Sequence, residues 1–166
     1  MTDSSSTGDL YSGRVLAGGR RLERATSGLF TADDVAAYCT RVPLEPGLSA
    51  AVSLDVSDDD TALALRSGEV AVLATPRLIA LCEEATLRAI DGHVPAGHTT
   101  VGMRVQLDHL APTAIGNKVT AEATLEKVEG LRLTFTVSAS DDRGLVAAGK
   151  VTRVVVDVER FLEKST

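Results

Sequence analysis

An alcohol, a carboxylate and an imidazole are spaced along the middle of the sequence as Thr75, Glu83 and His109. A carboxylate among apolar neighbours can attack a carbonyl directly or act as a base for water. A histidine titrates near neutral pH and can carry a proton. If the fold places these residues together, they suit hydrolytic chemistry that uses a nucleophile or base with a proton carrier.

The first element needed to position them is a helix, predicted from Pro76 to about Ile90. Thr75 suits the N-cap, and Pro76 suits the first helical position because its missing N–H is not needed there. Asp91-Gly92 ends the pattern. A charged stripe marks its solvent face and comprises Arg77, Glu84, Arg88 and Asp91.

Glu83 lies off this charged stripe, with Ile79, Ala80 and Leu87 among its helical neighbours. Since burying an isolated charge is costly, its carboxylate should either be buried with a partner or line a pocket. The other interpretation is that Glu83 lies at the edge of the apolar face and reaches water.

A strand is predicted at Val101–Leu110 because its residues alternate with period two. This alternation places His109 on the core face with Val101, Met103, Val105 and Leu107, and places Gly102 on the opposite face. A histidine at such a position is a catalytic candidate, although a hydrogen-bonded core histidine is the commoner case.

Further alternation predicts strands at 48–56, 119–125, 131–139 and 145–158, and the last of these is apolar on both faces, as in a central or interface strand. Turn signals separate the last strands. The order of one strand, one helix and four strands predicts an antiparallel sheet with one buried helix. The connection 61–73 should pass close to Thr75, and residues 160–166 read as a charged tail.

The chain of 166 residues carries a net charge of −6, which disfavours nucleic acid and anionic membranes as partners. An anionic ligand would therefore need a local basic patch. Two cysteines, Cys39 and Cys82, do not make a disulfide framework, and no apolar run is long enough to span a membrane. With no secretory pattern at the N-terminus, a cytoplasmic location is expected.

Residues 1–43 are predicted to be an N-terminal extension, partly disordered, with a short helix that opens at Thr31. The segment Leu10–Gly28 is basic. It is either a solvated arm or an arm whose arginines reach an anionic ligand or a partner subunit. Residues 44–166 are predicted to form the main domain.

Three segments carry a resemblance to a known family: ATPRLIALCEEA at 74–85, TTVGMRVQLDHLAPTAIG at 99–116, and EGLRLTFTVSASDDRGLVAAGKVTRVVVD at 129–157. Together they resemble the fluoroacetyl-CoA thioesterase-like family of hotdog-fold proteins, over roughly Leu44 to Leu162. The resemblance implies an α+β hotdog fold in which an antiparallel sheet wraps around one central helix. It also implies that Thr75, Glu83 and His109 form the catalytic set.

The implied function is hydrolysis of a small or short acyl-CoA thioester, with fluoroacetyl-CoA among the candidates and no cofactor required. The resemblance favours an acyl-Glu83 intermediate assisted by His109. Gly102, Pro76 and Arg77 are the predicted substrate-binding residues. A non-catalytic acyl-CoA sensor is the alternative. No metal is expected, because the three histidines have no further ligands at suitable spacing.

One constraint follows from helix geometry. Thr75 and Glu83 are eight residues apart, which is about 12 Å along a continuous helix. The two side chains cannot then touch within one helix. Either Thr75 acts from the loop ahead of the helix, or it serves the site together with a residue of another subunit; a composite site at a dimer interface is predicted. The homodimer itself is predicted because one helix cannot cover both faces of the sheet and the last strand reads as buried on both.

Overall fold

The computed structural model describes residues 44–165, so the predicted N-terminal extension, its basic arm and its short helix lie outside the described residues. The elements are strand β1 (Ser49–Asp55), the 3-10 turn η1 (Asp58–Asp60), helix α2 (Thr75–Ala89), strands β2 (His98–His109), β3 (Lys118–Glu129), β4 (Arg132–Asp141) and β5 (Gly144–Asp157), and helix α3 (Val158–Glu163). The predicted order of one strand, one helix and four strands is confirmed.

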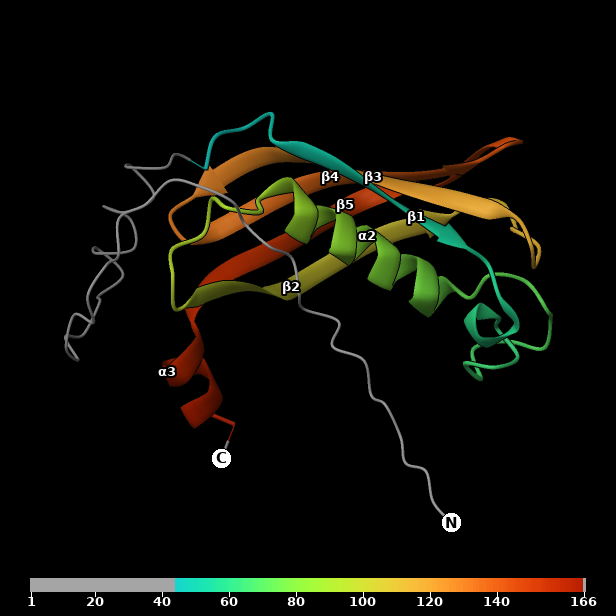
Figure 1. Ribbon diagram of the computed structural model, residues 1–166, viewed down its shortest axis with the longest axis horizontal. Coiled ribbons are helices and arrows are strands. Elements are labelled where there is room, and N and C mark those ends of the chain that lie inside the picture. Colours follow the sequence, from blue (N-terminus) through green and yellow to red (C-terminus); the bar gives the residue numbers. More distant parts are fainter. Residues whose placement is uncertain (1–43, 166) are drawn as a thin grey trace, which may run out of the picture.

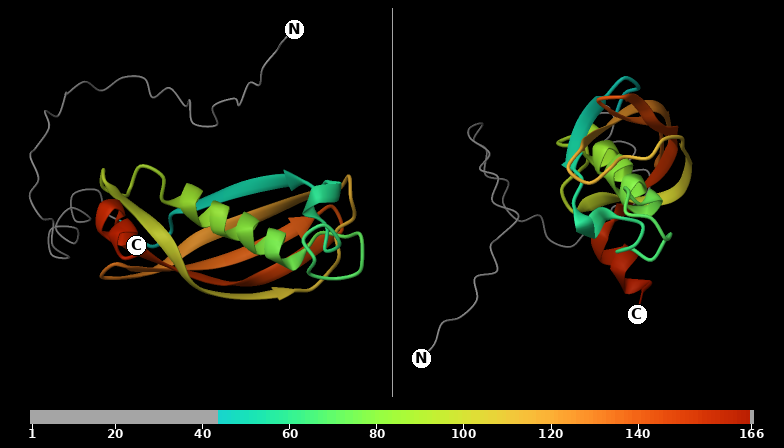
Figure 2. Two further views of the ribbon diagram at one scale, coloured as in Figure 1. Left: turned by 90° about the horizontal axis from the view of Figure 1, so that it is seen from below. Right: turned by 90° about the vertical axis from the view of Figure 1, so that its right-hand side faces the viewer.

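The five strands form one antiparallel sheet in the order β1-β3-β4-β5-β2. The sheet curls around α2, which runs along its concave face (Figures 1 and 2). This is the predicted hotdog arrangement. Strand β5 lies inside the sheet between β4 and β2, and this interior position explains why its sequence is apolar on both faces.

The core lies between the concave face and the buried side of α2. From the helix, Leu78, Leu81, Cys82 and Ala85 are at most 1% exposed. From the sheet, the fully buried side chains are those of Val119, Leu125, Leu133, Phe135 and Val151. Burial of these side chains holds the helix against the sheet, since each large apolar group contributes about 1.5–3 kcal/mol when removed from water.

A β-bulge in β2 changes which residues face the helix. Gly102 lies opposite Arg153, whereas Arg104 lies opposite the adjacent Thr152, so Met103 is an extra residue in β2. The extra residue shifts the alternation by one position. Gly102 and His109 consequently share the face toward α2, although they are an odd number of residues apart.

The prediction for this strand was therefore wrong before the bulge and right after it. Met103, expected on the core face, is 50% exposed, and Gly102, expected on the opposite face, is directly against the side chain of Glu83. Strict alternation carries no signal for a bulge, which explains the error.

The C-terminal segment also differs from the prediction of a charged tail. Residues Val158–Glu163 form α3, which projects from the end of the sheet (Figure 1). The side chain of Asp157 caps this helix by accepting a hydrogen bond from the backbone N–H of Arg160 at 2.9 Å. No helix in residues 44–165 is long and apolar enough to cross a membrane.

Strands β2 and β5 approach each other closely at Gly149, and Gly149→Ala tests this contact. A Cβ there would lie 2.0 Å from the carbonyl oxygen of Gln106 and 2.8 Å from the Cα of Leu107. Both are backbone atoms, so β2 would have to move. We expect a loss of roughly 2–3 kcal/mol in unfolding free energy, near the upper end for overpacking, measured by urea denaturation.

Ala148→Ser, on the outer face of the same strand, is the control and should change stability by less than about 0.5 kcal/mol. Wild-type stability for Gly149→Ala would contradict the close approach of the two strands.

Candidate active site

The start of α2 and the end of β2 bring together two of the three predicted catalytic residues, Thr75 and His109. Thr75 Oγ1 and His109 Nδ1 lie 2.9 Å apart, within hydrogen-bond distance. Ala74 occupies the N-cap and Thr75 is the first helical residue, so the helix begins one position earlier than the sequence indicated. The Thr75 hydroxyl therefore does not cap the helix and is directed to the imidazole ring.

The second ring nitrogen of His109 has a different environment. Nε2 is buried and has no hydrogen-bond partner within residues 44–165. Buried polar atoms in proteins are nearly always paired, so an unpaired one calls for an explanation. An imidazole held at Nδ1 and unpaired at Nε2 is suited to exchanging a proton with a bound molecule.

A cavity of about 310 Å³ lies beside this pair. Its lining comes from the connection before α2 and from the end of β2 and the loop that follows: Ala62, Ser67, Gly68, Val70, Val72, Leu73, Thr75, His109, Leu110, Ala111 and Pro112. The backbone N–H of Leu73 donates to the carbonyl oxygen of Thr113 at 2.9 Å and joins the two walls. The prediction that residues 61–73 pass close to Thr75 is confirmed.

Glu83 lies further along α2 and has a different set of neighbours. Its Oε1 is 3.4 Å from Nη1 of Arg153, and the Glu83 side chain is 33% exposed. A Cβ on Gly102 would come within 2.3 Å of the same oxygen. The carboxylate thus has a charged partner that is itself buried, although Glu83 is only partly buried, and a glycine makes room for it.

Arg153 is a site residue that sequence reasoning missed. It is 5% exposed, and its Nε and Nη2 donate to the hydroxyl and carbonyl oxygens of Thr100 at 2.9 and 2.8 Å. Burial lowers the pKa of Arg153, and the Glu83 carboxylate offsets part of this effect. The signal was present, because Arg153 falls on the inward row of β5 between Val151 and Val155.

Within one chain, the predicted catalytic residues form two separate clusters. Thr75 bonds His109, whereas Glu83 bonds Arg153, and no hydrogen bond or ion pair in the described part of the chain links the clusters. Because α2 is continuous from Thr75 to Ala89, the clusters are about 12 Å apart along its axis.

The predicted substrate-binding residue Arg77 has a partner in the preceding connection. Its Nε lies 2.7 Å from Oδ1 of Asp60. Burial acts to raise the pKa of Asp60, but hydrogen bonds from Ser57 and Arg77 outweigh it, so this pKa lies below the usual range. The pair ties the start of the 61–73 connection to α2. Contact of Arg77, or of the exposed Pro76, with substrate stays a prediction.

A thiol nucleophile and a bound metal ion are two other kinds of chemistry that a hydrolytic site can use. Cys82 is fully buried, and burial raises the pKa of its thiol to about 11, so it is a core residue and not a thiolate nucleophile. Among residues 44–165, no three His, Cys, Asp or Glu side chains are grouped so that they would hold a metal ion.

Comparisons with known proteins agree with the geometry. Residues 56–159 match the family described as fluoroacetyl-CoA-specific thioesterase. The chain is 36% identical over 93 residues to the fluoroacetyl-CoA thioesterase of Streptantibioticus cattleyicolor. The matched segment covers 56% of this chain and 67% of that relative.

Solved structures give the same result. The fluoroacetyl-CoA thioesterase FlK superposes with a TM-score of 0.70 at 29% identity, covering 74% of this chain and 95% of that one. A Thermus thermophilus protein described as a thioesterase superfamily member superposes with a TM-score of 0.68 at 28% identity, covering 74% of this chain and 93% of that one. A hot-dog-like protein from Thermanaerovibrio acidaminovorans superposes with a TM-score of 0.69 at 26% identity, covering 76% of this chain and 93% of that one. The chain belongs to the fluoroacetyl-CoA-specific thioesterase family.

Proposed function

We propose that this protein hydrolyses the thioester bond of a small or short acyl-CoA. The observation that carries the proposal is the Thr75–His109 hydrogen bond beside a cavity, in a chain of a thioesterase family. The curated relative is named for fluoroacetyl-CoA, which makes that ester one of the substrates to try. Family membership and the presence of all three reactive side chains favour an enzyme over a non-catalytic acyl-CoA sensor.

In the proposed reaction, the carboxylate of Glu83 attacks the thioester carbon and forms an acyl-Glu83 anhydride. The C–S bond breaks, and the departing CoA thiolate takes a proton from His109. Water then attacks the anhydride, with the now neutral imidazole as base, and releases the carboxylic acid. Thr75 holds the ring through Nδ1, and Arg153 pairs with the Glu83 carboxylate where it lies against Gly102. The scheme uses no cofactor, since the CoA ester is the substrate.

We further propose that the protein acts as a homodimer with a composite site. The surface around Glu83 is apolar and uncovered: Leu87 on α2 is 42% exposed, and Met103 on β2 is 50% exposed. Strand β2 is also an edge of the sheet, with one side available for pairing. A second copy covering this face would bring Glu83 of one subunit toward His109 of the other. A cytoplasmic location, expected from the two-cysteine composition, suits a CoA ester.

The central prediction concerns Glu83→Gln, which keeps the shape of the side chain and removes its negative charge. We expect the rate of thiol release from acyl-CoA to fall by about 10²–10⁴-fold or more, because the proposed nucleophile or base is lost. Thiol release over a panel of acyl-CoAs, with thermal unfolding as the folding check, measures this.

The matched control is Glu84→Gln, the next residue on the exposed face, whose partner is Arg88 at 3.9 Å. It should keep wild-type activity. A full rate in Glu83→Gln would remove Glu83 from the mechanism. Tight CoA-ester binding with no turnover by the wild-type protein would instead favour the sensor.

Gly102→Ala probes the space that the Glu83 carboxylate occupies. The new methyl group would meet Oε1, the end of a flexible side chain, so the fold should tolerate it while the carboxylate is displaced. We expect kcat to fall by roughly 10–100-fold, the scale for a displaced catalytic group. Steady-state kinetics and urea denaturation measure the two effects.

A second background sharpens this test. In Glu83→Asp the carboxylate is drawn back by one methylene group, so adding Gly102→Ala should lower kcat by a smaller factor than it does in the wild type. An equal fall in kcat in both backgrounds would show that the methyl group does not act on the Glu83 carboxylate.

Subunit mixing tests the composite site. Glu83→Gln and His109→Asn should each be inactive alone. A heterodimer of the two would hold one site with both residues intact, so a fully exchanged equal mixture should recover about a quarter of wild-type activity. Mixing Glu83→Gln with the Glu83→Gln/His109→Asn double variant is the control and should recover nothing. Absence of recovery in the first mixture, with exchange verified, would place all catalytic residues in one subunit.

A further inference from the structure

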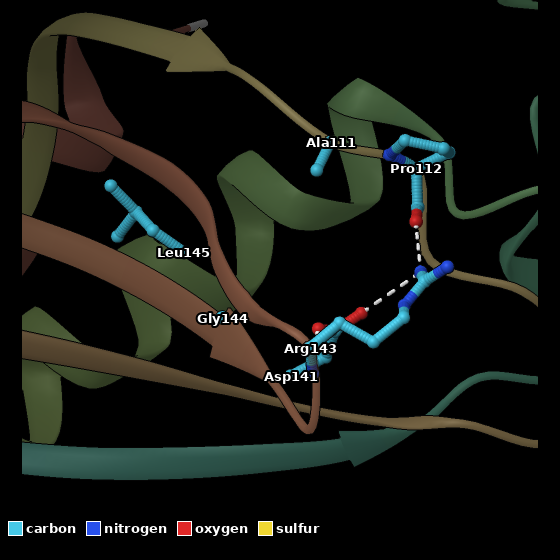
Figure 3. Close-up of a pocket in the computed structure, with 6 residues that line it drawn as sticks. All are labelled: Ala111, Pro112, Asp141, Arg143, Gly144 and Leu145. Atoms are coloured by element: carbon cyan, nitrogen blue, oxygen red, sulfur yellow. Dashed lines mark hydrogen bonds and ion pairs between the residues drawn. The ribbon is translucent and has the colours of Figure 1, made fainter.

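The turn between β4 and β5 carries an arginine whose side chain is held in place from one end. Nη2 of Arg143 donates to the carbonyl oxygen of Pro112 and, at 3.2 Å, to Oδ2 of Asp141 (Figure 3). The backbone N–H of Arg143 also donates to Oδ1 of Asp141 at 2.9 Å. A flexible side chain is thus fixed to two separate parts of the chain.

Asp141 is the buried anchor of this arrangement, with its side chain 2% exposed. The hydroxyl of Thr113 donates to it at 3.3 Å. The hydrogen bond from the backbone N–H of Arg143 is the largest of the effects that lower the pKa of Asp141, so the carboxylate stays charged. Asp141 therefore orients the Arg143 guanidinium without being open to solvent itself.

The other end of the guanidinium faces outward. The Arg143 side chain is 58% exposed, and its Nε–H and Nη1–H groups have no partner within residues 44–165. These N–H groups and the positive charge of the guanidinium remain available to an anion; Nε–H and Nη1–H point to opposite sides of the guanidinium, so each would reach a different oxygen. Because the side chain is already ordered, an anion bound there would require little further ordering.

The Arg143 guanidinium lies next to the candidate catalytic cavity. Ala111 and Pro112 line that cavity, and they also line an adjoining hollow of about 190 Å³ together with Asp141, Arg143, Gly144 and Leu145. Pro112 is three residues from His109, a span of at most about 10 Å. A long ligand that leaves the cavity across Pro112 would therefore reach Arg143.

Other basic residues near the cavity are less suited to an anion. Arg77 is paired with Asp60, and Arg153 is buried against Thr100 and Glu83. Arg66 is exposed in the 61–73 connection, but no contact within the described part of the chain fixes its side chain. The net charge of −6 means that the overall field does not attract an anion, so a local cation has to do so.

We propose that Arg143 binds a phosphate group of the CoA portion of the substrate. The inference rests on the proposed thioesterase function and names the residue that recognises the nucleotide end of the ester. Exposed Asp142, the preceding residue in the turn, opposes an anion, so the fixed guanidinium of Arg143 supplies the affinity. Leu145, 53% exposed, and Pro112 form the apolar wall beside it.

The test compares three thioesters with one acyl group: acetyl-CoA, acetyl-dephospho-CoA and acetylpantetheine. Arg143→Ala should raise KM for acetyl-CoA about 10-fold or more with kcat unchanged, as for a lost hydrogen bond to a charged group. KM for acetylpantetheine should not change, because this ester has neither the pyrophosphate nor the 3′-phosphate of CoA. Arg143→Lys should be intermediate, since it keeps the charge and loses the fixed guanidinium donors.

Acetyl-dephospho-CoA, which lacks only the 3′-phosphate, shows which phosphate group Arg143 binds. If Arg143→Ala still raises KM for this ester, Arg143 binds the pyrophosphate; if KM no longer changes, Arg143 binds the 3′-phosphate. Arg132→Ala, an exposed arginine at the opposite end of β4, is the control and should change none of the constants.

Two results would overturn the assignment: an unchanged KM for acetyl-CoA, or an equal loss with acetylpantetheine, which would make Arg143 a support of the hairpin. Failure of the proposed function is a separate result, in which the wild type releases no thiol from any ester. Titration calorimetry with CoA itself then decides the matter. Binding about 10-fold weaker in Arg143→Ala supports the assignment, whereas unchanged or absent binding overturns it.

Discussion

The ion pair between Glu83 and Arg153 is the constraint around which the candidate site is arranged. A buried guanidinium is costly unless its donors are paired, and Arg153 meets this requirement with Thr100 on one side and Glu83 on the other. The pair in turn requires that β2 come close to α2 without a side chain in between. Glycine at position 102 and the bulge that turns it inward meet that requirement.

The hotdog frame explains why the two reactive clusters are separate in one chain. The helix presents Thr75 at its start and Glu83 two turns later, and β2, which runs in the opposite direction along it, places His109 beside Thr75 and Gly102 beside Glu83. Each helix position therefore meets its own strand position. The apolar surface left uncovered around Glu83 is the feature that a second subunit would have to bury for the clusters to meet.

The positive charges near the site have distinct uses, which matters in an acidic protein that is proposed to bind an anionic ester. Arg77 fastens the connection that lines the cavity, and Arg153 orients a carboxylate. Both are paired with acids and contribute little net field. Arg143 also has an acidic partner, but its anchor is buried while its remaining donors are exposed. Exposure of the side chain, 58% for Arg143 against 29% for Arg77, distinguishes this arginine.

The sequence by itself determined the order of the elements, the position of α2, most of the inward-facing rows and the family. These depend on local periodicity, turn residues and ordered motifs, which a chain carries wherever it folds. Only the tertiary structure decided that Gly102 faces Glu83, that Arg153 is the partner of Glu83, and that the Thr75 hydroxyl bonds His109 and does not cap α2. Each of these depends on strand register and on contacts between residues far apart in the chain, and a single bulge reverses the face on which a side chain lies.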